Sequence, residues 1–266
     1  MSAIDDVFAK LRAENRKALM PFVTAGDPDL EFTAAVLTEL AVRGASLCEV
    51  GIPYSDPIAD GPVIQASYTR ALDNGIKLHS ILETLRSVAP QLTAPVVTMV
   101  SYAIIYRHGL EAYADALQQR GIAGMIVPDL PVEESPQLAK VCRARNLSLV
   151  QLVTPTTPRQ RALKITETSS GFLYYVSVAG ITGERTELPP DLIDRVSWLR
   201  EQTPLPVCIG FGISQPEHVK LLSPVADGLI VGSAIVRRMA DVQSLGRMET
   251  LKQIGDYVAT LLGALE

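Results

Sequence analysis

Cysteine is scarce in this sequence of 266 residues, and the three that occur are widely spaced. Cys48, Cys142 and Cys208 are odd in number and each lies among apolar residues, which argues against a disulfide framework and a CxxC metal site. We therefore interpret them as buried thiols of a protein from a reducing compartment.

Basic clusters and long apolar runs are also missing. The net charge is −5 and the lysines and arginines are scattered, which argues against a nucleic-acid partner. No apolar run approaches the roughly 18 residues of a membrane span, and the acidic residues near the N-terminus argue against a signal peptide. The sequence predicts a cytoplasmic protein that does not associate with membranes.

Short apolar runs rich in β-formers alternate with amphipathic stretches, a pattern typical of repeated βα units and a parallel sheet. About eight strands are predicted, over residues 18–24, 47–52, 96–101, 123–127, 147–153, 172–177, 206–210 and 228–231. Helices are predicted between them, among others over residues 31–43, 109–120, 133–144, 158–167 and 215–222, and an extra helix over 2–16 precedes the first strand.

The fold class expected from this order is α/β, as a single (β/α)8 TIM barrel that spans residues 1–266 and carries an extra N-terminal helix. Hydrophobic residues make up 47% of the chain, which is enough for one large core, and no polar linker divides it. An open doubly wound sheet is the alternative, because strands counted in one sequence are uncertain.

A carboxylate interrupts the apolar run of the second predicted strand. Side chains alternate along a strand, so Glu49 shares a face with Leu47 and Gly51, and Gly51 leaves room beside it. Burial raises the pKa of a carboxyl toward the range that suits acid–base catalysis. Glu49 is therefore a candidate catalytic residue, and the alternative is a structural carboxylate bonded to a polar group of a neighbouring strand.

The turn-rich loop after this strand carries two more carboxylates, Asp56 and Asp60, before a helix predicted to begin near Pro62. Ligands of such barrels bind at the C-terminal ends of the strands. Asp60 is therefore expected above the strand of Glu49, where the two can form an acid/base pair. The alternative is ordinary turn chemistry, which Asp-Pro and Asp-Gly pairs also provide.

Glycines end the last three predicted strands, in segments 180–183, 210–212 and 232–233. Backbone N–H groups there can point at an anion, and Gly232-Ser233 opens a short helix whose N-terminus favours negative charge. The loops after the seventh and eighth strands are the usual phosphate site of a barrel, so the predicted ligand is a phosphorylated small molecule. The polar, glycine-bearing segment 178–190 suits a lid.

Lysine and histidine are missing where two other mechanisms would need them. The seven lysines avoid the C-terminal strand ends, which argues against a Schiff-base aldolase. His79, His108 and His218 have no partners at metal-ligand spacing, so no metal site is predicted and each is interpreted as a surface or capping residue. If a carbon–carbon bond is cleaved here, the substrate itself must take up the electrons while carboxylates move protons.

Residues 49–65 read EVGIPYSDPIADGPVIQ. This stretch closely resembles the signature of the tryptophan synthase alpha subunit family, and the resemblance continues through residues 21–28, 128–134, 154–158, 180–183, 210–214 and 227–236. It covers essentially the whole chain. The resemblance implies retro-aldol cleavage of indole-3-glycerol phosphate to indole and glyceraldehyde 3-phosphate, in which the protonated indole ring accepts the electrons.

The resemblance also implies roles for individual residues. Glu49 would move protons between the ring carbon and the glycerol hydroxyl, and Asp60 would hold the ring N–H and stabilise its positive charge. The implied pocket walls are Phe22, Ile64, Tyr102, Tyr174 and Phe211. The implied phosphate cradle is Gly183, Gly212, Gly232 and Ser233, and Thr182 resembles the lid residue that closes over the carboxylates.

The family works with a beta subunit that carries pyridoxal phosphate and receives indole through a tunnel. The resemblance therefore implies an alpha2beta2 heterotetramer and no cofactor on this chain. Asp56 and Pro57 fall in the loop that faces the beta subunit in the family. The chain departs from the family pattern after Tyr102, where it reads AIIYRHG over 103–109 instead of an Asn, often followed by Pro, and an additional residue. This segment lies near the subunit interface in the family.

Three other functions fit parts of the pattern. A stand-alone lyase would release free indole, and high activity without a beta subunit would favour it. A non-catalytic barrel would only bind a phosphate or regulate a partner, but the presence of both Glu49 and Asp60 disfavours it. Another phosphate-binding barrel, such as a pentose-phosphate epimerase, is disfavoured because histidines at the strand ends are missing.

Overall fold

A closed barrel of parallel strands forms the centre of the protein. The computed structural model describes residues 2–57, 60–177, 191–210 and 212–265. Within these residues, eight strands follow one another around the barrel, and β8 pairs with β1 to close it. The strands are β1 (Ala18–Thr24), β2 (Cys48–Gly51), β3 (Val96–Met99), β4 (Gly124–Ile126), β5 (Ser148–Val153), β6 (Leu173–Val176), β7 (Val207–Gly210) and β8 (Gly228–Val231). The predicted (β/α)8 barrel is confirmed.

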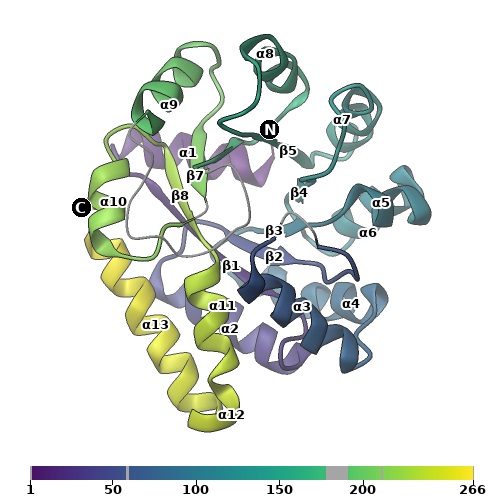
Figure 1. Ribbon diagram of the computed structural model, residues 1–266. Coiled ribbons are helices and arrows are strands. Elements are labelled where there is room, and N and C mark those ends of the chain that lie inside the picture. Colours follow the sequence, from purple (N-terminus) through teal and green to yellow (C-terminus); the bar gives the residue numbers. More distant parts are fainter. Residues whose placement is uncertain (1, 58–59, 178–190, 211, 266) are drawn as a thin grey trace.

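Helices surround the strands on all sides (Figure 1). They are α1 (Ala3–Ala13), α2 (Leu30–Arg43), α3 (Pro62–Asp73), α4 (Leu78–Val88), η1 (Ala89–Gln91), α5 (Tyr102–His108), α6 (Leu110–Gln118), α7 (Ser135–Arg143), α8 (Arg159–Thr168), α9 (Leu192–Glu201), α10 (Pro216–Leu222), α11 (Ser233–Ala240), α12 (Val242–Leu245) and α13 (Arg247–Gly263). Every β1 residue is buried. Burial on both faces explains why the strands read as continuous apolar runs rather than as alternating ones.

The strand bounds agree with the prediction at β1 and β8, and the third strand ends earlier than predicted. It stops at Met99 instead of residue 101, because Ser101 turns its side chain to accept the Ala103 N–H and caps α5. The carboxylate of Asp129, from the loop after β4, accepts hydrogen bonds from the Ser101 hydroxyl and the Tyr102 N–H, each at 2.7 Å. A polar cap thus replaces the last two residues of the predicted strand.

The predicted extra helix, α1, packs against the end of the barrel where the strands begin. Ser2 forms a capping box with Asp5 at its start. The Ser2 and Ser148 hydroxyls share a hydrogen bond of 2.7 Å, and the rings of Phe8 and Phe172 lie 5.8 Å apart. Because Ser148 and Phe172 lie at the start of β5 and just before β6, α1 covers the end opposite the predicted site.

The cysteines and histidines test the predictions of burial. All three cysteines are free and buried, as predicted. His79 and His108 are exposed. His218 is buried instead, and its Nδ1 accepts the Ser214 N–H at 3.4 Å just before α10, so the surface interpretation is wrong for this residue. Among the described residues, no helix combines the length and the apolar character that a membrane crossing requires.

Candidate active site

Glu49 is a carboxylate buried inside the barrel strand β2. It lies in β2 between Phe22 of β1 and Val97 of β3, and it is 1% exposed. Neither of its carboxylate oxygens has a hydrogen-bond partner among the described residues. Burial, assisted by the negative charge of Asp60, raises the pKa of Glu49 to about 8. The structure shows no bond to a neighbouring strand, so the alternative of a structural carboxylate is not supported.

Asp60 lies in the loop between β2 and α3, on the side where the strands end. Its N–H donates to the Pro57 carbonyl at 3.0 Å, and the Gln65 side-chain amide donates to the Asp60 carbonyl at 2.7 Å, so α3 holds the loop in place. Burial raises the pKa of Asp60 to about 6. Its charge also acts on Glu49, so the structure brings the two predicted carboxylates near each other.

The charges of both carboxylates affect the pKa values of two buried tyrosines. Burial and the charges of Asp60 and Glu49 raise the pKa of Tyr68, in α3, and of Tyr174, in β6, well above the usual value. Both hydroxyls therefore stay protonated at neutral pH. Tyr174 was predicted from the sequence and Tyr68 was not, although Ile64, Tyr68 and Ala71 follow the helical spacing of a buried face.

Two glycines make room for these aromatic rings. A Cβ on Gly51 would collide with the ring of Phe22 and would lie 2.6 Å from the Tyr68 hydroxyl oxygen. A Cβ on Gly210 would collide with the ring and hydroxyl of Tyr174. Gly51 was expected to leave space beside Glu49, and the structure shows that aromatic side chains occupy this space.

The remaining residues predicted to form the pocket walls differ in how deeply they are buried. Ile64 is buried in the first turn of α3, and Phe22 is buried beside Gly51. Tyr102 is only half-buried at the start of α5, and its pKa is raised by partial burial and by the charges of Glu134 and Tyr106. Its ring lies 6.1 Å from the Tyr106 ring, and the assignment of Tyr102 to the pocket wall stays a prediction.

The predicted phosphate cradle is described in part. Gly212 is buried with a φ of +79°, a left-handed conformation that favours glycine. Gly232 precedes α11 and Ser233 begins it, and the first N–H groups of a helix have no acceptor within it. A Cβ on Gly232 would lie 3.6 Å from the Phe22 Cβ, which places this helix start next to a predicted wall. Thr182, Gly183 and Phe211 lie outside the described residues, as does the predicted lid 178–190.

Helix α3 is tied to the loop after β1. The Arg70 guanidinium donates to both carboxylate oxygens of Asp27, at 2.9 and 2.6 Å, and the Asp27 side chain is 2% exposed. The Thr24 and Ser67 hydroxyls share a buried hydrogen bond of 2.6 Å. The helix that carries Tyr68 is thereby fixed against β1. No sequence pattern pointed to this ion pair.

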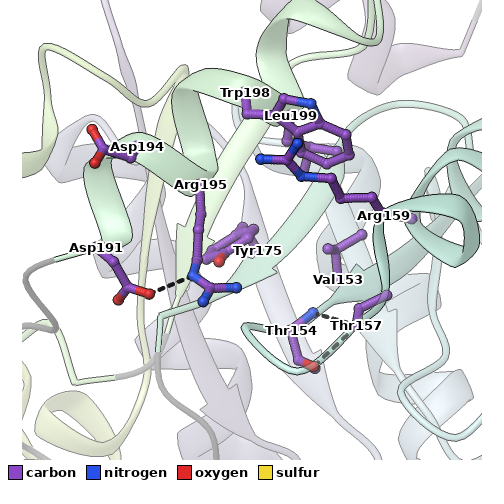
Figure 2. A pocket seen from close by; sticks show the side chains of 11 residues that line it. Val153, Thr154, Thr157, Arg159, Tyr175, Asp191, Asp194, Arg195, Trp198 and Leu199 are labelled. Carbon is purple, nitrogen blue, oxygen red and sulfur yellow. Dashed lines mark hydrogen bonds and ion pairs between the residues drawn. The ribbon is translucent and has the colours of Figure 1, made fainter.

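A separate cavity of about 370 Å³ lies outside the barrel, between α8 and α9 (Figure 2). Its two arginine side chains already have partners. Arg195 donates to Asp191 at 2.5 Å and to the Pro155 carbonyl at 2.8 Å, and the Arg159 guanidinium lies 4.8 Å from the centre of the Trp198 ring. This cavity contains none of the predicted site residues.

The raised pKa of Glu49 makes stability depend on pH. Between pH 5 and pH 8 the native state keeps a proton that the unfolded chain, with an ordinary pKa of 4.5, has already largely released. The free energy of unfolding should therefore fall as pH rises, by about 1.4 kcal/mol per pH unit at most. Asp60 adds a fall of the same sign up to its pKa of about 6.

Denaturant unfolding from pH 5 to pH 8 checks this prediction. Glu49→Gln should flatten the profile between pH 6 and pH 8, because the variant has no proton to release there. Parallel profiles for the two proteins would show that Glu49 ionises at an ordinary pH.

Comparison with known proteins shows similarity over the whole chain. The sequence model of the family described as "Tryptophan synthase alpha chain" matches residues 8–260. The tryptophan synthase alpha chain of Rhodopirellula baltica is 55% identical over 276 residues, which cover 100% of this chain and 99% of that protein.

Solved structures agree with the sequence comparison. Tryptophan synthase subunit alpha from Legionella pneumophila matches with a TM-score of 0.91 at 34% identity, and the match covers 100% of this chain and 98% of that one. A chain of the tryptophan synthase complex from Pyrococcus furiosus matches with a TM-score of 0.84 at 35% identity, over 93% of this chain and 99% of that one.

Proposed function

The chain belongs to the tryptophan synthase alpha chain family, and from this premise we propose that Glu49 and Asp60 carry out the retro-aldol cleavage of indole-3-glycerol phosphate. The products are indole and glyceraldehyde 3-phosphate, which makes the chain a carbon–carbon lyase. The observation that carries the proposal is the buried carboxyl of Glu49, which has no hydrogen-bond partner among the described residues, has a pKa raised to about 8 and lies near a second carboxylate. Buried polar groups without partners are uncommon and call for a functional explanation.

The two pKa values assign different roles to the two carboxyls. With a pKa of about 8, Glu49 is mostly protonated at neutral pH and can donate a proton to the ring carbon that bears the side chain. The positive charge then moves to the ring nitrogen. Asp60, with a pKa of about 6, is mostly ionised and can accept a hydrogen bond from the ring N–H. Carboxyls with separated pKa values are typical of acid/base pairs.

The second half of the reaction returns the proton. The Glu49 carboxylate formed in the first step takes the proton of the glycerol hydroxyl as its carbon becomes the aldehyde. The carbon–carbon bond breaks, its electron pair restores the neutral indole ring, and Glu49 is again protonated. No net proton is consumed, and the ring nitrogen serves as the electron sink.

The rest of the site positions the substrate. Phe22, Ile64 and Tyr174 provide buried apolar surface around the carboxylates. Gly212, Gly232 and Ser233 offer backbone N–H groups to the phosphate, with Gly183 in the same role by family resemblance. Thr182, Phe211 and Tyr102 stay in the proposal on the resemblance alone.

We include the beta subunit in the proposal as the partner that receives indole, in an alpha2beta2 assembly, with pyridoxal phosphate on the partner and no cofactor on this chain. The altered segment 103–109 lies mostly in α5, where Tyr106 is 71% exposed. A cavity of about 350 Å³ lined by Pro53 and Ile104 shows that α5 neighbours the loop after β2, which carries exposed Asp56. The altered segment therefore lies next to the start of the loop that carries Asp56, which supports a common surface for the partner. The buried free thiols suit a cytoplasmic location.

Indole release from indole-3-glycerol phosphate by the purified chain, with and without a tryptophan synthase beta subunit, tests the proposal. We expect slow release that rises sharply when the partner is added. Fast release by the chain alone would favour the stand-alone lyase. No release under either condition would contradict the catalytic proposal.

A further inference from the structure

A cavity of about 260 Å³ lies at the end of the barrel opposite Glu49. Three elements line it: the C-terminal part of α1 with the segment that follows, α9, and the residue before β8. Lys17 immediately precedes β1 and Asp227 immediately precedes β8, so both lie where the strands begin. A ligand bound here would not compete for space with a ligand above the C-terminal strand ends.

The lining of this cavity is strongly cationic. Arg12, Arg16, Lys17 and Arg200 face a single carboxylate, Asp227, although the whole chain has a net charge of −5. Asp227 is already engaged, because it accepts hydrogen bonds from Arg200 at 3.1 Å and from a backbone N–H of β7 at 2.9 Å. Asp227 is therefore not free to neutralise the other cations that line the cavity.

The ion pairs leave two of the cations without a carboxylate. Arg16 pairs with Glu14 at 3.0 Å and Arg200 pairs with Asp227. Arg12 and Lys17 have no ion-pair partner among the described residues. A concave surface lined by charges of one sign concentrates the opposite charge in solution.

Lys17 shows the effect of this crowding. Partial burial lowers its pKa, and the positive charges of Arg200 and Arg12 lower it further, against the opposing effect of Asp227. A bound anion would raise the pKa of Lys17 again, because a nearby negative charge favours the charged form of the lysine.

We propose that this cavity binds the phosphate group of a small molecule, held by Arg12, Lys17 and Arg16. Guanidinium groups match phosphate oxygens with paired N–H donors, and an ammonium adds a compact positive charge. The Asn15 amide supplies a further donor at the rim, and the buried side chains of Phe8 and Leu11 form an apolar wall. The site is independent of the proposed catalytic reaction.

Amide NMR of the full chain during titration with inorganic phosphate tests the proposal, with ionic strength held constant by sodium chloride. The Asn15 and Lys17 signals should shift and saturate, and the Gly232 and Ser233 signals report separately on the other end of the barrel. A parallel titration with glycerol 3-phosphate identifies the source: tighter binding indicates a phosphorylated metabolite, and equal affinity indicates free phosphate. Absence of saturable shifts at Asn15 and Lys17 with both probes would overturn the proposal.

A matched pair of variants makes the test specific. Arg12→Gln/Lys17→Gln should weaken binding at this cavity by about ten-fold or more. It should leave phosphate binding at Gly232 and indole release unchanged. Lys140→Gln/Arg143→Gln removes the same charge from exposed positions of α7 and should bind as the unchanged chain does. Equal affinity of both double variants would show that only the net charge attracts phosphate, which would overturn the site.

Discussion

Replacing Glu49 by glutamine should lower kcat for indole release by about a hundred- to ten-thousand-fold, the usual contribution of a general acid–base. Glutamine has nearly the same shape, but its amide can neither protonate the ring carbon nor take the hydroxyl proton. The measurement is indole release by the complex assembled with a beta subunit. KM should change little, because the other groups that hold the substrate remain.

Two features make this test clean. Neither Glu49 oxygen has a partner among the described residues, so glutamine breaks no hydrogen bond and the variant should fold. Glu167→Gln, at an exposed position of α8, is the matched control and should leave kcat unchanged. Unchanged turnover of Glu49→Gln in the assembled complex would favour a non-catalytic barrel.

Replacing Arg70 by methionine should lower the free energy of unfolding by about 3 kcal/mol, because it leaves a buried carboxylate without its cation. The Asp27 side chain is 2% exposed and both its oxygens accept from Arg70. The expected loss lies toward the low end of the range for buried pairs, since the Arg70 side chain itself is 36% exposed and water can reach the vacated position. Denaturant unfolding measures the loss.

An exposed ion pair provides the control. Arg161 and Glu133 lie 3.1 Å apart with side chains 47% and 67% exposed, so Arg161→Met should cost less than about 1 kcal/mol. Adding Asp27→Asn to Arg70→Met removes the buried charge and should recover part of the loss. Equal losses for Arg70→Met and Arg161→Met would contradict the importance of the buried pair.

Hydrophobic periodicity was sufficient to predict the barrel. The apolar runs of β1 and β8 predicted both strands with the bounds that the structure shows. At the end of β3 a polar side chain was responsible for the wrong bound, because Ser101 caps α5 instead of continuing the strand. Hydrogen bonds from a serine side chain to the nearby backbone compete with strand pairing, and the pattern of apolar residues does not reveal them.

The candidate site was predicted in part. Alternation along β2 pointed to Glu49 and Gly51, and the loop position pointed to Asp60, because these signals are local in the chain. The proximity of Tyr68 was missed, since its ring reaches the carboxylates only when α3 packs against β1 and β2. Tyr102 was proposed as a pocket wall from the family resemblance alone, and the structure shows it only half-buried at the start of α5.

The sequence by itself determined the order of strands and helices and the burial of the cysteines, and it led to the prediction of carboxylate chemistry rather than lysine or metal chemistry. The tertiary structure alone decided the raised pKa values of Glu49 and Asp60, the Asp27–Arg70 pair across 43 residues, and the meeting of Lys17, Arg200 and Asp227 at one cavity. The physical reason is that strand and helix patterns reflect neighbours within a few residues. Desolvation and Coulomb interactions depend instead on every group that the fold brings near, however far apart in the chain.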